Sequence, residues 1–310
     1  MNEILNDFKN AWNKPNNAVP QLIIINVVIF LVLGFIRVLS TVAQAEGIFN
    51  FLYFQFAIPP IFSDFITRPW TLLTYSFAHD FGGIFHILFN MLFLYWFGKL
   101  VVEYLGSQKL INLYVLGALA GSILYLMAYN GIPYYVQRSV NISGMVGASA
   151  AVNAILVGAA TLLPNYTLFL MFIGPVKLKY IAAFYIVISY LGTIGGNAGG
   201  NIAHLGGAAM GYFYVKQLQN GTDFGKWIFT IMQFTKSLFA PQPKIKVSHK
   251  RSDRKRGTKF SSGSTKNKRT SSSGDIPNQD EIDAILDKIS QKGYESLSKE
   301  EKQKLFNASK

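Results

Sequence analysis

A serine and two histidines stand out because each lies in an apolar stretch. Ser149 is surrounded by glycine and alanine in "VGASAAVNAI". His204 lies in "NIAHLGGAAMGY", and His86 begins "HILFNMLF", in which Asn90 follows four residues later. A serine hydroxyl becomes a nucleophile when a nearby base, most often an imidazole, accepts its proton. A serine among small residues is equally typical of close helix packing, so the chemistry depends on which residues the fold brings together.

Six apolar segments are candidates for membrane-spanning helices, each of which needs about 20 mostly apolar residues. They are residues 20–40, 82–104, 109–129, 147–164, 178–192 and 201–218. Pro164 and the pair Gly174-Pro175 interrupt the further apolar stretch 165–176, so we expect an interfacial connection there and no seventh span. Of the 310 residues, 50% are hydrophobic and 15% are charged. The predicted fold class is therefore all-α, a polytopic membrane protein with a six-helix bundle.

The distribution of lysine and arginine predicts the orientation of this bundle. Six spans place both termini on one side of the membrane, and cytoplasmic loops carry an excess of basic residues. One face of the predicted topology carries Lys9, Lys14, Lys99, Lys109, Lys177, Lys179 and Lys216. The loops on the other face carry Arg68 and Arg138. We therefore expect an integral membrane protein with both termini in the cytoplasm.

This topology places the candidate residues at a similar depth. The second, fourth and sixth spans all run inward from the outer face, so Ser149 lies at the outer end of its span. His86 and His204 lie about one turn below that face, and Asn90 lies one turn deeper than His86 on the same side of its helix. Ionisable side chains inside a membrane are rare and usually functional. No carboxylate lies in the outer halves of the spans, so the pattern predicts a Ser–His dyad and not a triad.

The start of a helix at Ser149 suits this chemistry. The first backbone N–H groups of a helix have no partner within it, so they can face a developing oxyanion. His86 and Asn90, on one helical face, can add two side-chain donors. The sequence thus offers a nucleophile, a base and a set of oxyanion donors on three spans.

Small residues recur where two of these spans must meet. Ala203, Gly207 and Gly211 follow one another every four residues along the last span. Such a stripe lets helix backbones approach closely. Gly147 and Ala151 offer a small face on the fourth span. We expect this contact to bring the histidine of the last span against the serine of the fourth.

Three motifs, in order and on the predicted spans, resemble the rhomboid family of intramembrane serine proteases, of the bacterial type. A His-x-x-x-Asn pair matches His86 and Asn90, and a Gly-x-Ser motif matches Gly147 and Ser149. An Ala-His-x-x-Gly-x-x-x-Gly pattern matches residues 203–211. The resemblance covers roughly residues 15–220. It implies hydrolysis of peptide bonds in or near transmembrane segments of single-span or other membrane proteins, in a bacterial inner membrane and without a cofactor.

The resemblance also implies a role for each motif residue. Ser149 would be the nucleophile and His204 the general base, and His86, Asn90 and the Ser149 backbone N–H would form the oxyanion hole. The loop 192–200, "GTIGGNAGG", would cap the site and move to admit substrate.

Three positions depart from the family pattern. Ala150 follows the serine where the family usually has glycine, and Asn153 stands where an aromatic residue often packs on the catalytic histidine. The first loop has Arg68 before Trp70, whereas the family commonly has Trp-Arg. None of these changes removes a catalytic group, so we expect activity and leave the substrate preference open.

Other functions explain the sequence less well. A catalytically silent rhomboid-like protein that binds membrane-protein clients typically lacks the serine or the histidine, and this chain keeps both. A small-solute transporter is disfavoured because no inverted repeat is evident. A metal site formed by His79, His86 and His204 would lack a carboxylate or thiolate ligand, since the chain contains no cysteine. We therefore expect no metal, and a structural role for His79 in its loop.

The chain outside the bundle divides by composition. Residues 1–19 form the predicted N-terminus, residues 20–220 the membrane domain and residues 221–240 a juxtamembrane segment. Residues 241–275 read as a basic disordered linker that carries most of the formal net charge of +13. Because this linker follows a membrane domain, contact with anionic lipid is a better prediction than binding to nucleic acid.

Residues 276–310 read as a small cytoplasmic helical module. Ile282, Ile285, Leu286 and Ile289 have helical spacing. Gly293 breaks this pattern, and Ser298 with Glu301 predicts a capping box at the start of a second helix. The tail resembles cytoplasmic extensions of some bacterial rhomboids.

Overall fold

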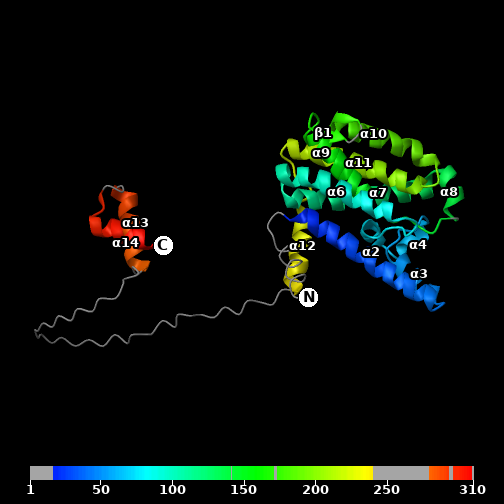
Figure 1. The fold of residues 1–310 in the computed structure, drawn as a ribbon, viewed down its shortest axis with the longest axis horizontal. Coiled ribbons are helices and arrows are strands. Elements are labelled where there is room, and N and C mark those ends of the chain that lie inside the picture. The colour runs from blue at the N-terminus through cyan, green and yellow to red at the C-terminus, as the bar shows by residue number, and fades with distance from the viewer. Residues whose placement is uncertain (1–16, 141, 171–172, 240–278, 293–295, 309–310) are drawn as a thin grey trace, which may run out of the picture. The chain divides into compact units, whose positions relative to one another are not determined.

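The computed structural model describes residues 17–140, 142–170, 173–239, 279–292 and 296–308 (Figure 1). The chain divides into two compact units, Met1–Gln242 and Pro243–Lys310. The predicted basic linker and most of the predicted N-terminus lie outside the described residues. The first unit contains the candidate site.

Six helices of the first unit coincide with the six predicted segments. They are α2 (Ala18–Val42), α6 (Ile84–Leu105), α7 (Ser107–Gly131), α9 (Ser149–Leu162), α10 (Leu178–Leu191) and α11 (Ala198–Gln219). Helix α11 packs against α7, α9 and α10, and α9 also packs against α6 and α7. Figure 1 shows α6, α7, α9, α10 and α11 gathered into one layered bundle, with α2 crossing it obliquely. The prediction of an all-α bundle is confirmed.

The outer surface of the bundle is apolar. By length and composition, α2, α6 and α7 can cross a membrane, and α9 and α10 are shorter apolar helices. On α2, Leu31, Phe35 and Val42 are 62%, 65% and 79% exposed. Since α9 and α10 have 14 residues each, each spans only about 21 Å at 1.5 Å per residue, less than the roughly 30 Å hydrocarbon core. Helix α9 is enclosed by the others, and 11 of its residues are buried.

Small residues set the crossing of α9 and α11. A Cβ atom on Gly207 would overlap the carbonyl oxygen of Ala150, and one on Gly211 would overlap that of Ala154. The predicted close approach along α11 is therefore present. Its partner face on α9 differs from the prediction, because Ala150 and Ala154 meet α11. The contact with α11 is made by the backbone of these two alanines, while their side chains meet α7. A Cβ on Gly117 would overlap the Ala154 Cβ atom and lie 3.2 Å from the Ala151 Cα atom, and a Cβ on Gly121 would lie 2.6 Å from the Ala150 Cβ atom.

The predicted connection after α9 is a β-hairpin. Strand β1 (Thr167–Leu170) pairs antiparallel with β2 (Gly174–Lys177). The Leu178 N–H, at the start of α10, donates to the carbonyl of Tyr166 with an N–O distance of 2.8 Å. The residues of 165–176 that the structure describes form no helix, which agrees with the predicted connection, while the strand pairing was not predicted.

The loop between α2 and α6 contains short helices. They are α3 (Glu46–Phe54), α4 (Phe62–Ile66), α5 (Thr71–Thr74) and the 3-10 turn η1 (Tyr75–Phe77). Arg68 and Trp70 brace this loop, since their side chains donate to the carbonyls of Phe54 and Gln55. Helix α8 (Pro133–Ser139) lies in the loop after α7, and the 3-10 turn η2 (Gly192–Ile194) follows α10.

A polar cluster joins α11 to the next helix, α12 (Lys226–Phe239). The carboxylate of Asp223 pairs with Lys109 on α7 and accepts hydrogen bonds from the Tyr214 hydroxyl and the Gly225 N–H. The Tyr214 hydroxyl in turn accepts a hydrogen bond from Asn112 at 2.7 Å. Burial alone would raise the pKa of Asp223, but the hydrogen bonds from Lys109, Tyr214 and Gly225 lower it overall.

The second unit contains two helices, α13 (Gln279–Lys292) and α14 (Lys299–Ala308). The predicted capping box is confirmed, because the Ser298 N–H donates to the Glu301 carboxylate and the Glu301 N–H donates to the Ser298 hydroxyl. Glu301 also pairs with Lys288 at 2.8 Å. Ile285 and Leu297 are buried between the helices. Gly293 lies outside the described residues.

Candidate active site

Ser149 is the first residue of α9, and the segment before it is tied to the first loop. Ile58 and Met145 exchange two backbone hydrogen bonds of 3.0 and 2.9 Å. The Gly147 N–H donates to the carbonyl of Tyr75 at 2.9 Å. Gly147 has a φ of +136°, a conformation that favours glycine over residues with a side chain. Gly147 thus lies just before α9 and turns the chain into it, whereas the sequence predicted a packing residue within the span.

His204 of α11 lies beside this serine. Its Nε2 atom is 2.7 Å from the Ser149 Oγ atom. Both residues are half-buried. A hydroxyl and an imidazole nitrogen at this distance are in hydrogen-bond contact, so the structure brings together the serine and the histidine that the sequence singled out.

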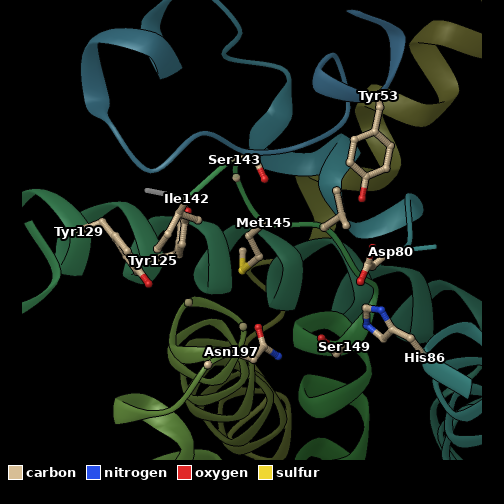
Figure 2. A pocket seen from close by; sticks show the side chains of 15 residues that line it. Tyr53, Asp80, His86, Tyr125, Tyr129, Ile142, Ser143, Met145, Ser149 and Asn197 are labelled. Atoms are coloured by element: carbon tan, nitrogen blue, oxygen red, sulfur yellow. The ribbon is translucent and has the colours of Figure 1, made fainter. Parts of the chain in front are cut away.

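His86, in the first turn of α6, lies on the other side of Gly147. A Cβ atom on Gly147 would lie 3.1 Å from the His86 Nε2 atom and 3.6 Å from the Ser149 Oγ atom. Figure 2 shows His86 and Ser149 facing one cavity. The glycine therefore has a second effect, since a side chain there would crowd the space between the imidazole and the hydroxyl.

Two asparagines one turn below these residues bond to the backbone. The Asn90 amide donates to the carbonyl of His86 at 2.8 Å, and the Asn153 amide donates to the carbonyl of Ser149 at 2.9 Å. Asn90 is 7% exposed and does not line the cavity. Direct donation by Asn90 to an oxyanion stays a prediction. Asn153 supports the first turn of α9 from the position where the family often has an aromatic residue.

A serine on α10 that was not among the predicted site residues also contacts His204. The Ser189 Oγ atom is 3.3 Å from the Nδ1 atom of His204. The only signal in the sequence was a polar residue within the apolar fifth span, with no fixed spacing to the other motifs. His204 therefore contacts a serine through each of its ring nitrogens.

His79 is completely buried beside His86. The two rings meet edge to face, with centroids 5.3 Å apart. Burial lowers the pKa of His79 to about 3, with a smaller contribution from His86, so His79 is neutral at physiological pH. The predicted structural role in the loop agrees with this position. Among the residues that the structure describes, no group of three or more His, Cys, Asp or Glu is arranged to hold a metal ion.

The cavity at the site has a volume of about 580 Å³. Its wall includes Ser149 and His86 from the helix starts and Gly144, Met145 and Val146 from the segment before α9. Figure 2 shows Asp80 and Tyr53 at one end and Tyr125 and Tyr129 at the other. The rim reaches solvent, because Asp80, Ser143, Gly196 and Asn197 are exposed.

The predicted capping loop lines the same cavity. Gly196, Asn197, Gly199 and Gly200 belong to its wall, and the Asn197 side chain reaches toward the serine in Figure 2. The Asn201 amide holds the loop closed on itself by donating to the carbonyl of Gly192 at 3.1 Å. The position of the loop fits a cap, and its movement stays a prediction.

The segment that carries these features is similar to a known protein family. Residues 67–219 match the model of the rhomboid domain family. The chain belongs to the rhomboid family. The matched range contains Trp70 of the first loop, the hairpin, and His86, Ser149 and His204 of the candidate site. The sequence-based identification is confirmed.

The curated relatives are rhomboid proteins of organelles. The chain is 38% identical over 164 residues to RHOMBOID-like protein 12, mitochondrial, of Arabidopsis thaliana, which covers 50% of this chain and 48% of that protein. It is 29% identical over 160 residues to Rhomboid protein 1, mitochondrial, of Saccharomyces cerevisiae, which covers 49% of this chain and 42% of the relative. The chain thus matches less than half the length of either relative. Residues 276–310 match a second family, DUF6576, whose function is unknown.

The rhomboid assignment makes the first unit an integral membrane domain. The exposed apolar side chains of α2, α6 and α10 are then surfaces in contact with lipid. The polar residues of the candidate site lie on the inward sides of α6, α9 and α11, where protein and not lipid surrounds them.

Proposed function

We propose that this rhomboid protein is an intramembrane serine endopeptidase with Ser149 as nucleophile and His204 as general base. The observation that supports this most directly is the 2.7 Å contact between the His204 Nε2 and Ser149 Oγ atoms. A nucleophile within hydrogen-bond reach of a base is the arrangement that acyl transfer requires. The water-accessible cavity beside Ser149 supplies room for a peptide segment.

The reaction follows from the positions of these atoms. The Ser149 Oγ atom attacks the carbonyl carbon of the peptide bond while its proton passes to the His204 Nε2 atom. His204 then gives this proton to the departing amine, and an acyl-enzyme remains. Water, losing a proton to the same nitrogen, then attacks the ester. The bond from the carbonyl carbon to the Ser149 Oγ atom breaks, the new carboxyl terminus leaves, and His204 returns the proton to Oγ.

The oxyanion would be held at the start of α9. The backbone N–H groups of the first turn lack helical partners, and the imidazole of His86 lies next to them across Gly147. Donors fixed in advance around developing charge are often the largest contribution to such catalysis. Asn90 supports His86 through its hydrogen bond to the His86 carbonyl, and direct donation by its amide is part of the proposal.

The proposed substrates are single-span or other membrane proteins. A peptide bond inside a helix is shielded, and its backbone groups must find new partners when the helix opens in a membrane. The polar cavity wall, with Ser143 and Asn197 at its rim, offers such partners to an unwound segment. Cleavage would therefore fall in or near a transmembrane segment at the depth of Ser149.

We also propose that both termini face the cytoplasm. The support is the excess of lysine on the side where α6 meets α7 and where α10 begins. A bacterial inner membrane remains the prediction from the motifs, although the relatives named above are mitochondrial. The basic run 241–275 would then lie beside anionic lipid headgroups.

Cleavage of a single-span reporter by the purified full-length protein tests this function. Wild type should release two fragments, and Ser149→Ala and His204→Ala should each reduce the rate by at least about 10³-fold. Ser40→Ala is a matched control, because Ser40 is a buried helical serine on α2 that bonds to the Ile36 carbonyl. Reporter that binds to wild type but stays intact would favour a catalytically silent client-binding protein.

A further inference from the structure

We propose that Ser189 on α10 is a positioning residue for His204. Its hydroxyl oxygen accepts the Nδ1–H of the imidazole and so selects the tautomer in which Nε2 is free to take the serine proton. The proposal rests on the proposed function of the dyad. Its geometric basis is the 3.3 Å distance between the Ser189 Oγ and His204 Nδ1 atoms.

The burial of Ser189 is unusual for its helix. The buried residues of α10 are Leu178, Ala182 and Ser189, while its other side chains are largely directed away from the core. Phe184, Tyr190 and Leu191, for example, are 62%, 68% and 61% exposed. A hydroxyl in a buried position needs a hydrogen-bond partner, and His204 is the partner that this one reaches.

Other helical serines in the protein use their hydroxyls differently. Ser40 donates to the Ile36 carbonyl at 2.7 Å, Ser139 to the Val136 carbonyl at 2.8 Å, and Ser237 to the Phe234 carbonyl at 2.7 Å. Bonds of this kind, back to a preceding turn, are the common arrangement for serine in a helix. The bond recorded for Ser189 crosses to another helix and ends on an imidazole. It therefore connects α10 to the base of the proposed dyad.

The direction of this hydrogen bond matters for the chemistry. A neutral imidazole carries one proton, so one nitrogen donates and the other accepts. If Ser189 donated to Nδ1, Nε2 would carry the proton and could not accept another from Ser149. If Nδ1–H donates to the Ser189 oxygen, Nε2 has its lone pair toward Ser149. Only the second arrangement gives a base, and it also keeps an acceptor in place when His204 becomes an imidazolium.

Among the residues of the candidate site, no other side chain near His204 is placed to accept its Nδ1–H. The outer halves of the six helices contain no carboxylate that could orient the imidazole of His204. The nearby loop residue Asp80 lies on the His86 side of the cavity. Asn153, at the position where the family often places an aromatic residue against the histidine, bonds to the Ser149 carbonyl. A neutral hydroxyl is a weaker acceptor than a carboxylate. We therefore expect a moderate contribution and not an essential one.

The first test measures kinetics. Ser189→Ala should lower kcat for reporter cleavage by about three- to tenfold, the value of one neutral hydrogen bond, with KM unchanged. Ser189→Thr keeps a hydroxyl and should recover most of the lost kcat. Ser40→Ala, which removes another buried helical hydroxyl, should leave both constants as in wild type. An unchanged kcat in Ser189→Ala, or an equal loss in Ser40→Ala, would overturn the proposal.

The second test reads the tautomer in the resting protein and does not depend on proteolysis. Protein labelled with ¹⁵N-histidine gives separate ring-nitrogen shifts for the two tautomers, and His204→Gln identifies the His204 signals. Wild type should show a protonated Nδ1 and an unprotonated Nε2, and Ser189→Ala should move toward a mixture. A protonated Nε2 in wild type, or an unchanged pattern in Ser189→Ala, would contradict the role of Ser189 even if the protein cleaves its reporter. A protein with the expected tautomer that cleaves nothing would instead count against the proposed function.

Discussion

The Nε2 atom of His204 lies 2.7 Å from the Oγ atom of Ser149, although 55 residues separate them in the chain. This contact depends on the crossing of α9 and α11, where Gly207 and Gly211 let the two backbones touch. It also depends on the segment before α9, which the bridge between Ile58 and Met145 holds to the first loop. The distance between the two side chains therefore depends on how closely the backbones of α9 and α11 pack.

Substitution of Gly207 by alanine should separate the proposed dyad. The new Cβ atom would overlap the Ala150 carbonyl oxygen, so α11 must move away from α9. Overpacking of this kind costs about 1–3 kcal/mol, and a displacement of about 1 Å at reacting groups can cost 10²-fold in rate. Thermal unfolding in detergent and reporter cleavage measure the two effects.

Gly47→Ala is the matched control for this substitution. Gly47 lies in α3, where an added Cβ atom would meet nothing within 4 Å. It should therefore leave the unfolding temperature and the cleavage rate close to those of wild type. Wild-type stability and activity in Gly207→Ala would show that the helices are less tightly packed than the structure indicates.

Substitution of His86 should lower kcat more than substitution of Asn90. His86→Ala removes the imidazole beside Ser149 and should lower kcat by about 10²–10³-fold, as expected for the loss of one oxyanion donor. Asn90→Ala removes a hydrogen bond to the His86 carbonyl, so we expect a smaller loss, of about tenfold. Steady-state kinetics with one reporter compare them. A larger effect of Asn90→Ala would mean that its amide turns to the oxyanion during the reaction.

Asp223 should stabilise the joint between α11 and α12 in a pH-dependent manner. Hydrogen bonds from Lys109, Tyr214 and Gly225 hold the pKa of Asp223 below its ordinary value. A lowered pKa means that the carboxylate contributes stability above the unfolded value of about 3.9, and that this contribution is lost as the pH falls through the folded value. Asp223→Asn should therefore lower the free energy of unfolding by about 1–2 kcal/mol at pH 7, and the difference from wild type should shrink toward pH 3.

Asp64→Asn serves as the comparison for Asp223→Asn. Asp64 is an exposed residue of the short helix α4, so its substitution should have little effect at either pH. Thermal unfolding curves at several pH values provide the measurement. A difference between wild type and Asp223→Asn that stays constant down to pH 3 would rule out the ionised carboxylate as its source.

The membrane orientation can be tested with single cysteines, because the chain contains none of its own. Gln137 in α8 and Glu46 in α3 are exposed residues of short helices on the face of the site, so Gln137→Cys and Glu46→Cys report on that face. Asn165→Cys and Asn220→Cys lie at exposed positions on the opposite face. In intact cells an impermeant maleimide should label the first pair and leave the second pair unlabelled. The reverse pattern would invert the proposed orientation.

The sequence predicts the helices well because a membrane imposes a simple pattern on them. Long apolar segments such as 109–129 must form helices to satisfy their backbone groups in lipid, and α7 (Ser107–Gly131) follows this rule. The contact between Ser149 and His204 was also predictable, because ionisable and nucleophilic side chains are rare within membrane spans. For this reason, the sequence offers few alternative pairs of a nucleophile and a base.

Details of rotation and pairing could not be predicted in the same way. The face of α9 that meets α11 is Ala150 and Ala154, not Gly147 and Ala151, because many positions on that helix are small and do not distinguish its sides. The contact of Ser189 with His204 depends on how α10 is rotated. The hairpin of β1 and β2 has no alternating pattern that separates it from an apolar turn.

Covalent labelling of Ser149 tests the central claim most directly. A fluorophosphonate reacts with a serine only when a base activates its hydroxyl, and mass spectrometry locates the modified residue. We predict a single adduct on Ser149 in the wild-type protein, strong loss of labelling in His204→Ala, and none in Ser149→Ala. An unmodified Ser149 in folded wild-type protein, or equal labelling in His204→Ala, would contradict the account of this site as a Ser–His dyad.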